Sequence, residues 1–203
     1  MRTLEMLGVL AVAVVAASAV RVNADLITFD DIATNNSVTS VPSGYHGFNW
    51  GAGGFYAVSQ NYDPSQGWAD GVVSAPNAVF NAAGQPYSLT SSTAGNSFVF
   101  NSAYFASPGY VGGSPVTVTG SLHGTQVGSL SFDTTTTPVL ENFNWTVDTV
   151  TFTDTYYAVF EMDNLTVSSV PEPSTLIVLS LLGTLAITIG QWRRKWAAAR
   201  ASS

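Results

Sequence analysis

The stretch between Asp25 and Val170 has almost no helical patterning, and this feature constrains the fold of the 203-residue chain most strongly. Thr, Ser, Val, Gly, Asn and aromatic residues dominate it, and Gly or Pro interrupts it about every ten residues. Short runs that alternate apolar and polar residues, such as 116–119 and 150–153, are typical of strands with one buried face. We therefore predict an all-β domain of roughly eight to ten strands, a single jelly-roll-like β-sandwich.

The last predicted strand, residues 157–167, changes its pattern in the middle. Its apolar residues before Asp163 and those after Asn164 have opposite parity, so they would point to opposite faces of a regular strand. A β-bulge at Asp163-Asn164 would return both sets to the same core. The alternative is that these two residues simply end the strand.

Charge and cysteine content exclude several functions. No Lys or Arg lies between Asp25 and Val170, whereas all thirteen acidic residues except Glu5 and Glu172 lie there. With both histidines neutral, this stretch carries a formal charge of about −11, which repels nucleic acids and anionic membranes. The chain has no Cys, so disulfides, zinc–thiolate sites and thiol nucleophiles are excluded. We expect no nucleic-acid partner.

The N-terminus indicates export. A basic residue precedes an apolar segment at 7–17, and the residues at 22–24 fit a small-x-small cleavage site. We predict a signal peptide at residues 1–24, with cleavage after Ala19 as the second choice. An uncleaved membrane helix is the alternative, but the apolar segment is short for a span of about 20 residues.

The C-terminus has the pattern of a membrane anchor. Residues 176–192 are uncharged and mostly apolar, and their 17 positions are near the lower limit for crossing a bilayer. Arg193, Arg194 and Lys195 follow directly and would stay on the cytoplasmic side. We predict a transmembrane helix over 176–192 with a basic tail; a buried core helix is the alternative.

The order Val-Pro-Glu-Pro-Ser at 170–174, apolar span and basic cluster resembles the PEP-CTERM protein-sorting signal, also known as the ice-binding-protein C-terminal domain family. The resemblance implies a sorting motif made of Pro171, Glu172, Pro173, Arg193, Arg194 and Lys195. It also implies an exosortase-type protease as partner, in a Gram-negative bacterium. The precursor would be anchored in the inner membrane by its C-terminal helix and then moved to the cell surface or extracellular matrix. The tail after Lys195 is longer than is usual in that family, and the ice-binding label implies no ice binding here.

These signals divide the chain into three parts. Residues 1–24 are the predicted signal peptide and residues 25–169 the β-sandwich ectodomain. Residues 170–203 form the sorting signal. The ectodomain also loosely resembles jelly-roll carbohydrate-binding domains. The segments that carry this likeness are 27–31, 44–50 and 160–167.

That second resemblance implies a structural calcium ion between the first and last strands. Asp30, Asp31 and Asp163 are the candidate ligands, because carboxylates and carbonyl oxygens suit the six to eight oxygen ligands of Ca²⁺. The alternative is that these carboxylates lie exposed at strand ends.

A cluster of aromatic and glycine residues between 45 and 68 is a candidate glycan-binding surface. Aromatic rings stack on sugar faces, and Trp50, Trp68 and Tyr62 are the candidates, with Trp50 and Trp68 expected as an exposed pair. The alternative is that most of these rings form the core, since aromatic side chains bury large areas.

Glu161 and Asp163 are the one pair that suggests catalysis. Side chains at i and i+2 share a face of a strand, and retaining glycosidases need two carboxyl groups about 5 Å apart. Some jelly-roll glucanases add a further Glu about three residues on, which this chain lacks. We therefore predict no enzyme activity, and an exported surface or matrix protein that associates with exopolysaccharide. The alternative is a hydrolase of envelope polysaccharide.

Overall fold

Twelve strands and two short 3-10 turns make up the described part of the chain, and no α-helix occurs there. The computed structural model describes residues 23–51, 53–82, 86–109, 111, 113–154 and 159–170. The strands are β1 (Ala24–Ile27), β2 (Val38–Ser40), β3 (Phe48–Asn49), β4 (Phe55–Ser59), β5 (Asn77–Asn81), β6 (Tyr87–Ser91), β7 (Phe98–Ala106), β8 (Pro115–Leu122), β9 (Thr125–Asp133), β10 (Val139–Val147), β11 (Thr149–Asp154) and β12 (Glu161–Ser169). The turns are Tyr45–Gly47 and Pro64–Gln66.

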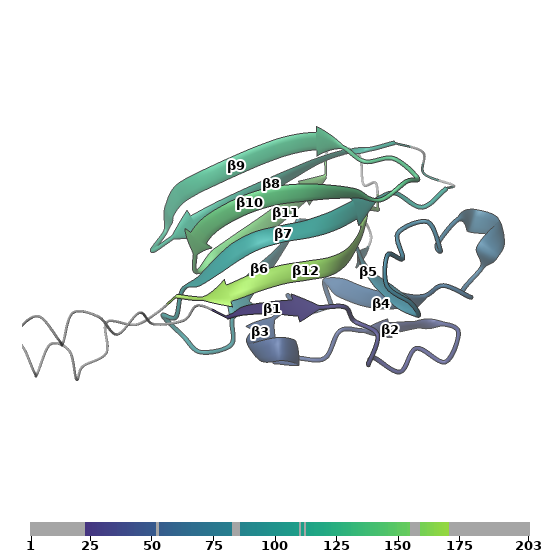
Figure 1. The fold of residues 1–203 in the computed structure, drawn as a ribbon, viewed down its shortest axis with the longest axis horizontal. Coiled ribbons are helices and arrows are strands. Elements are labelled where there is room, and N and C mark those ends of the chain that lie inside the picture. Colours follow the sequence, from purple (N-terminus) through teal and green to yellow (C-terminus); the bar gives the residue numbers. More distant parts are fainter. Residues whose placement is uncertain are drawn as a thin grey trace, which may run out of the picture. The chain divides into compact units, whose positions relative to one another are not determined.

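The strands form two antiparallel sheets that pack as a sandwich (Figure 1), which confirms the predicted all-β sandwich. Sheet A has seven strands in the order β10-β7-β12-β5-β4-β2, with β1 added along β12. Sheet B has five strands in the order β3-β6-β11-β8-β9. The number of strands exceeds the predicted eight to ten because β1, β2 and β3 are short segments of two to four residues at or near the sheet edges.

The core lies between the sheets and follows from strand alternation. In β11, Val150 and Phe152 are buried while the residues beside them are half-buried. Phe152 reaches across to sheet A, where its ring centroid lies 6.1 Å from Phe100 and 6.3 Å from Phe105. Such aromatic pairs add about 0.5–1.5 kcal/mol each beyond the area they bury. Inter-sheet aromatic packing is therefore a main contribution to holding the two layers together, in a domain without disulfides.

The predicted bulge in the last strand is confirmed. The pairing of β12 with β7 changes register between Asp163 and Thr166, and Asn164 has a left-handed φ of 49°. The bulge lets Met162 and Leu165 both be fully buried although they have opposite parity. The first strand, β1, pairs antiparallel with β12, so the first and last strands are adjacent as predicted.

The described strands belong to one structural unit, Asn23–Val170. Within it, no helix is long and apolar enough to cross a membrane. The predicted signal peptide and the predicted transmembrane helix at 176–192 lie outside the described residues, as do the six residues of the sorting motif. The domain boundaries assigned from the sequence stay predictions.

Candidate functional site

Trp50 is a core residue, and its predicted exposure is wrong. Its side chain is 3% exposed and its ring lies 5.3 Å from Phe29 and 5.7 Å from Phe55, both in edge-on contacts. The indole N–H donates to the carbonyl of Tyr45 at 3.0 Å. A tryptophan whose polar atom has an internal partner is stable in the core, where its large ring stabilises the fold most.

Trp68 is also buried, at 8% exposed, so the predicted exposed pair does not exist. It belongs to the connection between β4 and β5, residues 60–76, here called loop 60–76. The ring of Trp68 packs 4.8 Å from Phe80 and 6.1 Å from the half-buried Tyr62, with Val58 beneath. This loop therefore builds a second, smaller apolar cluster of its own. Of the three predicted glycan-binding rings, only Tyr62 retains appreciable exposure.

The outer face of sheet B carries rows of hydroxyl groups, a feature that the sequence analysis did not identify. On β8 and β11 the outward positions alternate with buried valine and phenylalanine, so their orientation follows from strand geometry. We call this surface the hydroxyl face. It consists of Ser88, Thr90, Thr117, Thr119, Ser121, Ser129, Ser131, Thr149, Thr151 and Thr153. The sequence signal was the Val-Thr alternation at 116–119 and 150–153, which also marked these segments as strands.

Hydroxyl groups on neighbouring strands lie directly opposite one another across the hydroxyl face. Thr117 and Ser131 face each other with their side-chain oxygens 2.8 Å apart. Ser88 and Thr151 form a second such pair, with their side-chain oxygens 3.0 Å apart. Strand geometry spaces such groups by about 4.8 Å across the sheet and about 6.7 Å along a strand. Each hydroxyl both donates and accepts, so the face can exchange hydrogen bonds with a neutral ligand that is rich in hydroxyl groups.

A polar groove adjoins the hydroxyl face at β3. One hollow of about 380 Å³ is lined by Asn49, Thr90, Thr149, Asp148 and the loop at 91–96. A second hollow, of about 540 Å³, is lined by Asn49, Ser40, Val41, Ser43, Trp50, Gly51, Gly53 and Tyr56. Asn49 lines both hollows, and we call the two together the groove. Thr90 and Thr149 belong to both the groove and the hydroxyl face.

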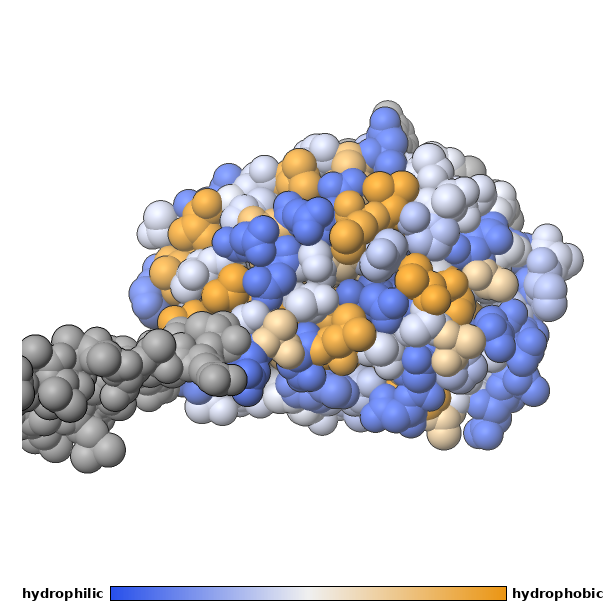
Figure 2. Space-filling model, in the orientation of Figure 1, coloured by the Kyte–Doolittle hydropathy of each residue, from blue (hydrophilic) through white to orange (hydrophobic). Residues whose placement is uncertain are grey.

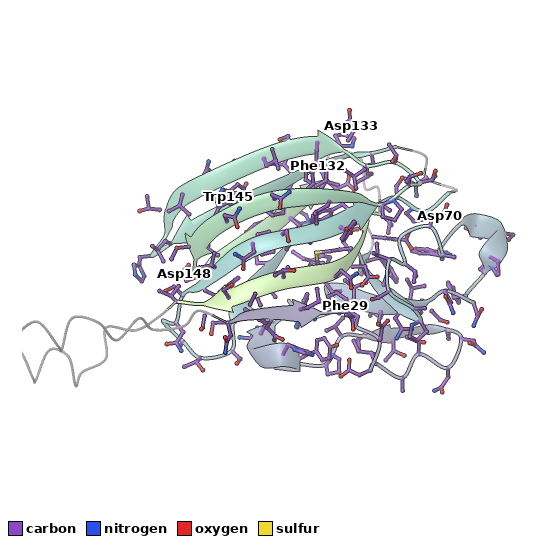
Figure 3. The ribbon with its side chains drawn as sticks, viewed as in Figure 1. Phe29, Asp70, Phe132, Asp133, Trp145 and Asp148 are labelled. Atoms are coloured by element: carbon purple, nitrogen blue, oxygen red, sulfur yellow. The ribbon has the colours of Figure 1, made fainter. Side chains whose placement is uncertain are left out.

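Asp148 is the only acidic side chain among the described residues that line these two hollows. Its Oδ2 accepts the backbone N–H of His123 at 2.6 Å, and its Oδ1 accepts the hydroxyl of Thr149 at 3.0 Å. The His123 N–H is the main reason that the pKa of Asp148 is held below its ordinary value. Figure 3 shows Asp148 at the end of the sandwich opposite Asp70. The groove thus contains a fixed acceptor, Asp148, in one hollow and an aromatic ring, Tyr56, in the other.

The outer face of sheet A has a different character. Figure 2 shows this side as a mixture of hydrophilic and hydrophobic residues. Its exposed apolar side chains include Leu26 and Leu140. At the β12–β5 end, by contrast, loop 60–76 covers two buried carboxyl groups and donates hydrogen bonds to one of them, Asp163.

The three predicted calcium ligands do not form one site. Asp31 accepts the hydroxyl of Tyr45, and this contact together with burial raises the pKa of Tyr45. Asp30 accepts the backbone N–H of Asn77 at 3.2 Å. Across residues 23–170, apart from the short gaps given above, no three His, Cys, Asp or Glu side chains are arranged to hold a metal ion. Calcium binding by these three residues therefore has no support from their geometry.

Asp163 is satisfied by protein donors. It is fully buried, and its Oδ2 accepts the backbone N–H groups of Val73 and Ser74 at 2.7 and 2.8 Å. Its Oδ1 accepts the N–H of Asn164 at 2.6 Å. Desolvation raises the pKa of Asp163 to about 7 in spite of these bonds. Strand alternation, regular up to Asp163, directs this carboxyl outward to loop 60–76, which it fastens to β12.

Glu161, the other member of the suggested catalytic pair, is fully buried. Neither of its carboxyl oxygens has a hydrogen-bond partner among the described residues. Burial, with a smaller contribution from the nearby Asp70, raises its pKa to about 9. The Gly71 amide lies close enough to favour the charged form but does not meet hydrogen-bond geometry. Because Glu161 and Asp163 are both inaccessible, a polysaccharide cannot reach them in this conformation.

No family model matches this chain, and no curated protein matches it. Among solved structures, the chain is loosely similar to carbohydrate-binding modules. A family 29 module has a TM-score of 0.39 and 15% identity, covering 73% of this chain and 90% of its own. A variant of the module CBM29-2 gives the same score and identity, with 73% and 93% covered. TmCBM61, solved in complex with β-1,4-galactotriose, has a TM-score of 0.34 and 13% identity and covers 64% and 95%. The galactotriose is a ligand of TmCBM61. TM-scores and identities as low as these do not assign this chain to a family.

Proposed function

We propose that this protein is an exported, non-catalytic protein of the cell surface or extracellular matrix that associates with neutral exopolysaccharide. Its β-domain would bind through the hydroxyl face and the adjoining groove. Its C-terminal segment would act as a PEP-CTERM-type signal, holding the precursor in the inner membrane until an exosortase-type protease processes it.

The hydroxyl face is the observation that carries this proposal. Ten Ser and Thr side chains share one sheet face, and the acidic Asp133 lies only at the end of their row on β9. A single hydrogen bond exchanged with water contributes only about 0.5–1.5 kcal/mol net, so one hydroxyl alone would bind nothing. A repeating array facing a repeating ligand adds many such contacts, and a polysaccharide is such a ligand. Tyr56 in the groove supplies a ring edge or face.

The negative charge of the domain favours neutral polysaccharides over anionic ones. Eleven acidic residues and no Lys or Arg lie between Asp25 and Val170. An anionic polysaccharide such as alginate would be repelled, most strongly at low ionic strength. A neutral chain meets no such penalty.

Retention of the full-length protein on insoluble neutral polysaccharides, with alginate as the anionic comparison, tests the binding half. We expect retention on at least one neutral polysaccharide and none on alginate. Thr151→Val and Asn49→Ala should weaken retention at least threefold. Thr146→Val, the same kind of substitution on an exposed position of β10, is the matched control and should leave it unchanged. Absence of retention on every neutral polysaccharide, or equal retention by all variants, would refute the proposal.

The hydrolase alternative is tested in the same samples. Release of reducing ends over several hours would show turnover and overturn the non-catalytic assignment. We expect none, because Glu161 and Asp163 are buried.

The sorting half is tested by fractionating cells that produce Glu172→Ala. This variant should accumulate in the inner membrane at precursor size, whereas the neighbouring control Ser174→Ala should be processed normally. Normal processing of Glu172→Ala would exclude the motif as the recognised signal.

A further inference from the structure

The carboxyl group of Glu161 is the least compensated polar group in the described part of the protein. Glu161 begins β12 between β5 and β7, where it pairs with Phe80 on one side and Ala106 on the other. It is 0% exposed, and its two oxygens are the only buried side-chain polar atoms without a hydrogen-bond partner among the described residues. A buried carboxylate in this condition is costly unless a positive charge or donors reach it. The protein therefore needs a source of compensation at this point.

That compensation cannot come from a basic side chain of this domain. No Lys or Arg occurs between Asp25 and Val170. The two histidines contact Asp25 and Asp148 instead, at 3.2 and 3.4 Å. Only a proton or a cation from outside can neutralise Glu161.

The segment of loop 60–76 that packs against Glu161 does so with its backbone at Gly71, which has no side chain. A Cβ added to Gly71 would lie 2.4 Å from the Cβ of Glu161 and 2.7 Å from its Oε2, so the loop backbone rests directly on this side chain. Asp70 precedes Gly71, and its carboxylate lies over the backbone of Gly67 and Gly109. Figure 3 shows Asp70 at the end of the sandwich where β12 begins. Asp70 is thus the sequence neighbour of the residue that rests on Glu161, and its negative charge lies near enough to raise the pKa of Glu161.

We propose that Glu161 and Asp70 hold a divalent cation, Ca²⁺, between the start of β12 and loop 60–76. Backbone carbonyl groups and water would complete its oxygen shell. Ca²⁺ accepts six to eight oxygens, carbonyl oxygens and water among them, in flexible geometry, whereas Mg²⁺ requires a near-ideal octahedral shell. The like-charge repulsion between the two carboxyl groups becomes an attraction to the shared ion.

This location differs from the calcium site inferred from the sequence. Asp163 already accepts three backbone N–H groups, and Asp30 and Asp31 each have a protein donor, so none of the three needs an ion. Glu161 has no such donor. The ion would fasten loop 60–76 at Asp70, a few residues before the point where Asp163 fastens it at Val73 and Ser74.

Calorimetric titration of the metal-free, full-length protein with CaCl₂ tests the site directly. We expect one saturable site and a melting temperature that rises with calcium. At a free calcium concentration 100 times the dissociation constant, the folding equilibrium should shift by roughly 100-fold. Glu161→Gln keeps the side-chain shape and should abolish both effects. Asp70→Asn lies on the loop, leaves β12 intact, and should weaken affinity at least tenfold.

Two control variants give the experiment its specificity. Glu141→Gln, the same substitution on β10, should bind calcium like the natural protein. Asp31→Asn should also bind normally. Loss of binding in Asp31→Asn with binding kept in Glu161→Gln would overturn the proposal in favour of the site inferred from the sequence. No saturable binding by the natural protein would overturn it as well.

Discussion

The two outer faces of this sandwich present polar groups in opposite ways. On sheet B the hydroxyl face is uncovered, and its Ser and Thr side chains, like Asp133 at the end of the β9 row, remain half-buried or exposed. On sheet A, at the start of β12, the outward carboxyl groups of Glu161 and Asp163 are fully buried, and backbone groups of loop 60–76 pack against them. Strand alternation sends all of these side chains outward. Whether an outward side chain meets water is decided by the connections between strands.

The burial of Glu161 and Asp163 on sheet A should make stability depend on pH, and we expect this to be the largest of the effects predicted here. Burial raises the pKa of Asp163 from 3.8 to about 7 and that of Glu161 from 4.5 to about 9. Between those limits the folded state binds more protons than the unfolded state, so stability falls as pH rises. Without divalent cations, we expect the free energy of unfolding to be higher at pH 5 than at pH 7 and higher at pH 7 than at pH 9. Urea denaturation in EDTA at these three values measures it.

Glu161→Gln is the control for the upper part of that range. It should flatten the decline between pH 7 and pH 9, because glutamine does not titrate. The shift at Asp148 has the opposite sign, since its lowered pKa gives stability that is lost only as the pH falls into the acid range. A stability that is constant from pH 5 to pH 9 would contradict the burial of both carboxyl groups.

Asp163→Ala should detach loop 60–76 from the start of β12. It leaves the N–H groups of Val73, Ser74 and Asn164 without their acceptor and should cost about 3 kcal/mol. Hydrogen exchange at Val73 and Ser74 should quicken. Asp133→Ala, at an exposed position of β9, is the matched comparison and should change stability by less than about 0.5 kcal/mol. Equal effects of the two variants would show that loop 60–76 is not held by Asp163.

Gly71→Ala tests how closely the loop backbone rests on Glu161. The new Cβ would overlap the side chain of Glu161 at 2.4 Å, so we expect a loss of about 2 kcal/mol and a displaced loop. At Gly109 the nearest atoms would be 3.2 and 3.4 Å away, so Gly109→Ala should be clearly milder. Thermal melts of the two variants compare them, and equal melting temperatures would rule out the tight contact.

The smallest effect on stability is expected on the hydroxyl face. Thr151→Val removes the partner of the Ser88 hydroxyl, but on an uncovered face water can replace it. The change in the free energy of unfolding should stay within about 0.5 kcal/mol, as for other surface substitutions. A loss above about 1 kcal/mol in urea denaturation would mean that the hydroxyl rows serve the fold itself.

Much of the architecture could be predicted from local patterns. Val-Thr alternation predicted strands at 116–119 and 150–153, and the parity change at Asp163-Asn164 predicted the bulge that the register of β12 shows. The adjacency of the first and last strands followed from the expected sandwich. Each of these features depends on residues that are neighbours in sequence or on a common rule of β-sandwich topology.

Local sequence patterns predicted the candidate sites less well than the strands. Trp50 and Trp68 were expected at the surface, but Trp50 packs into the main core and Trp68, from loop 60–76, packs onto β4 and β5 in the smaller cluster. The hydroxyl face was visible in the alternation, yet only the pairing of β6, β11, β8 and β9 brings its rows together. Both outcomes depend on contacts between residues far apart in the chain.

The sequence by itself therefore determined the class of the domain, the bulge in β12, and a body whose carboxyl groups have no basic side chain to pair with. The tertiary structure decided which of those carboxyl groups meet water. Loop 60–76 folds back over β12 and removes Glu161 and Asp163 from solvent, while the hydroxyl rows of sheet B stay uncovered. The physical reason is that strand periodicity fixes the direction of a side chain, whereas desolvation depends on which distant segment packs against it.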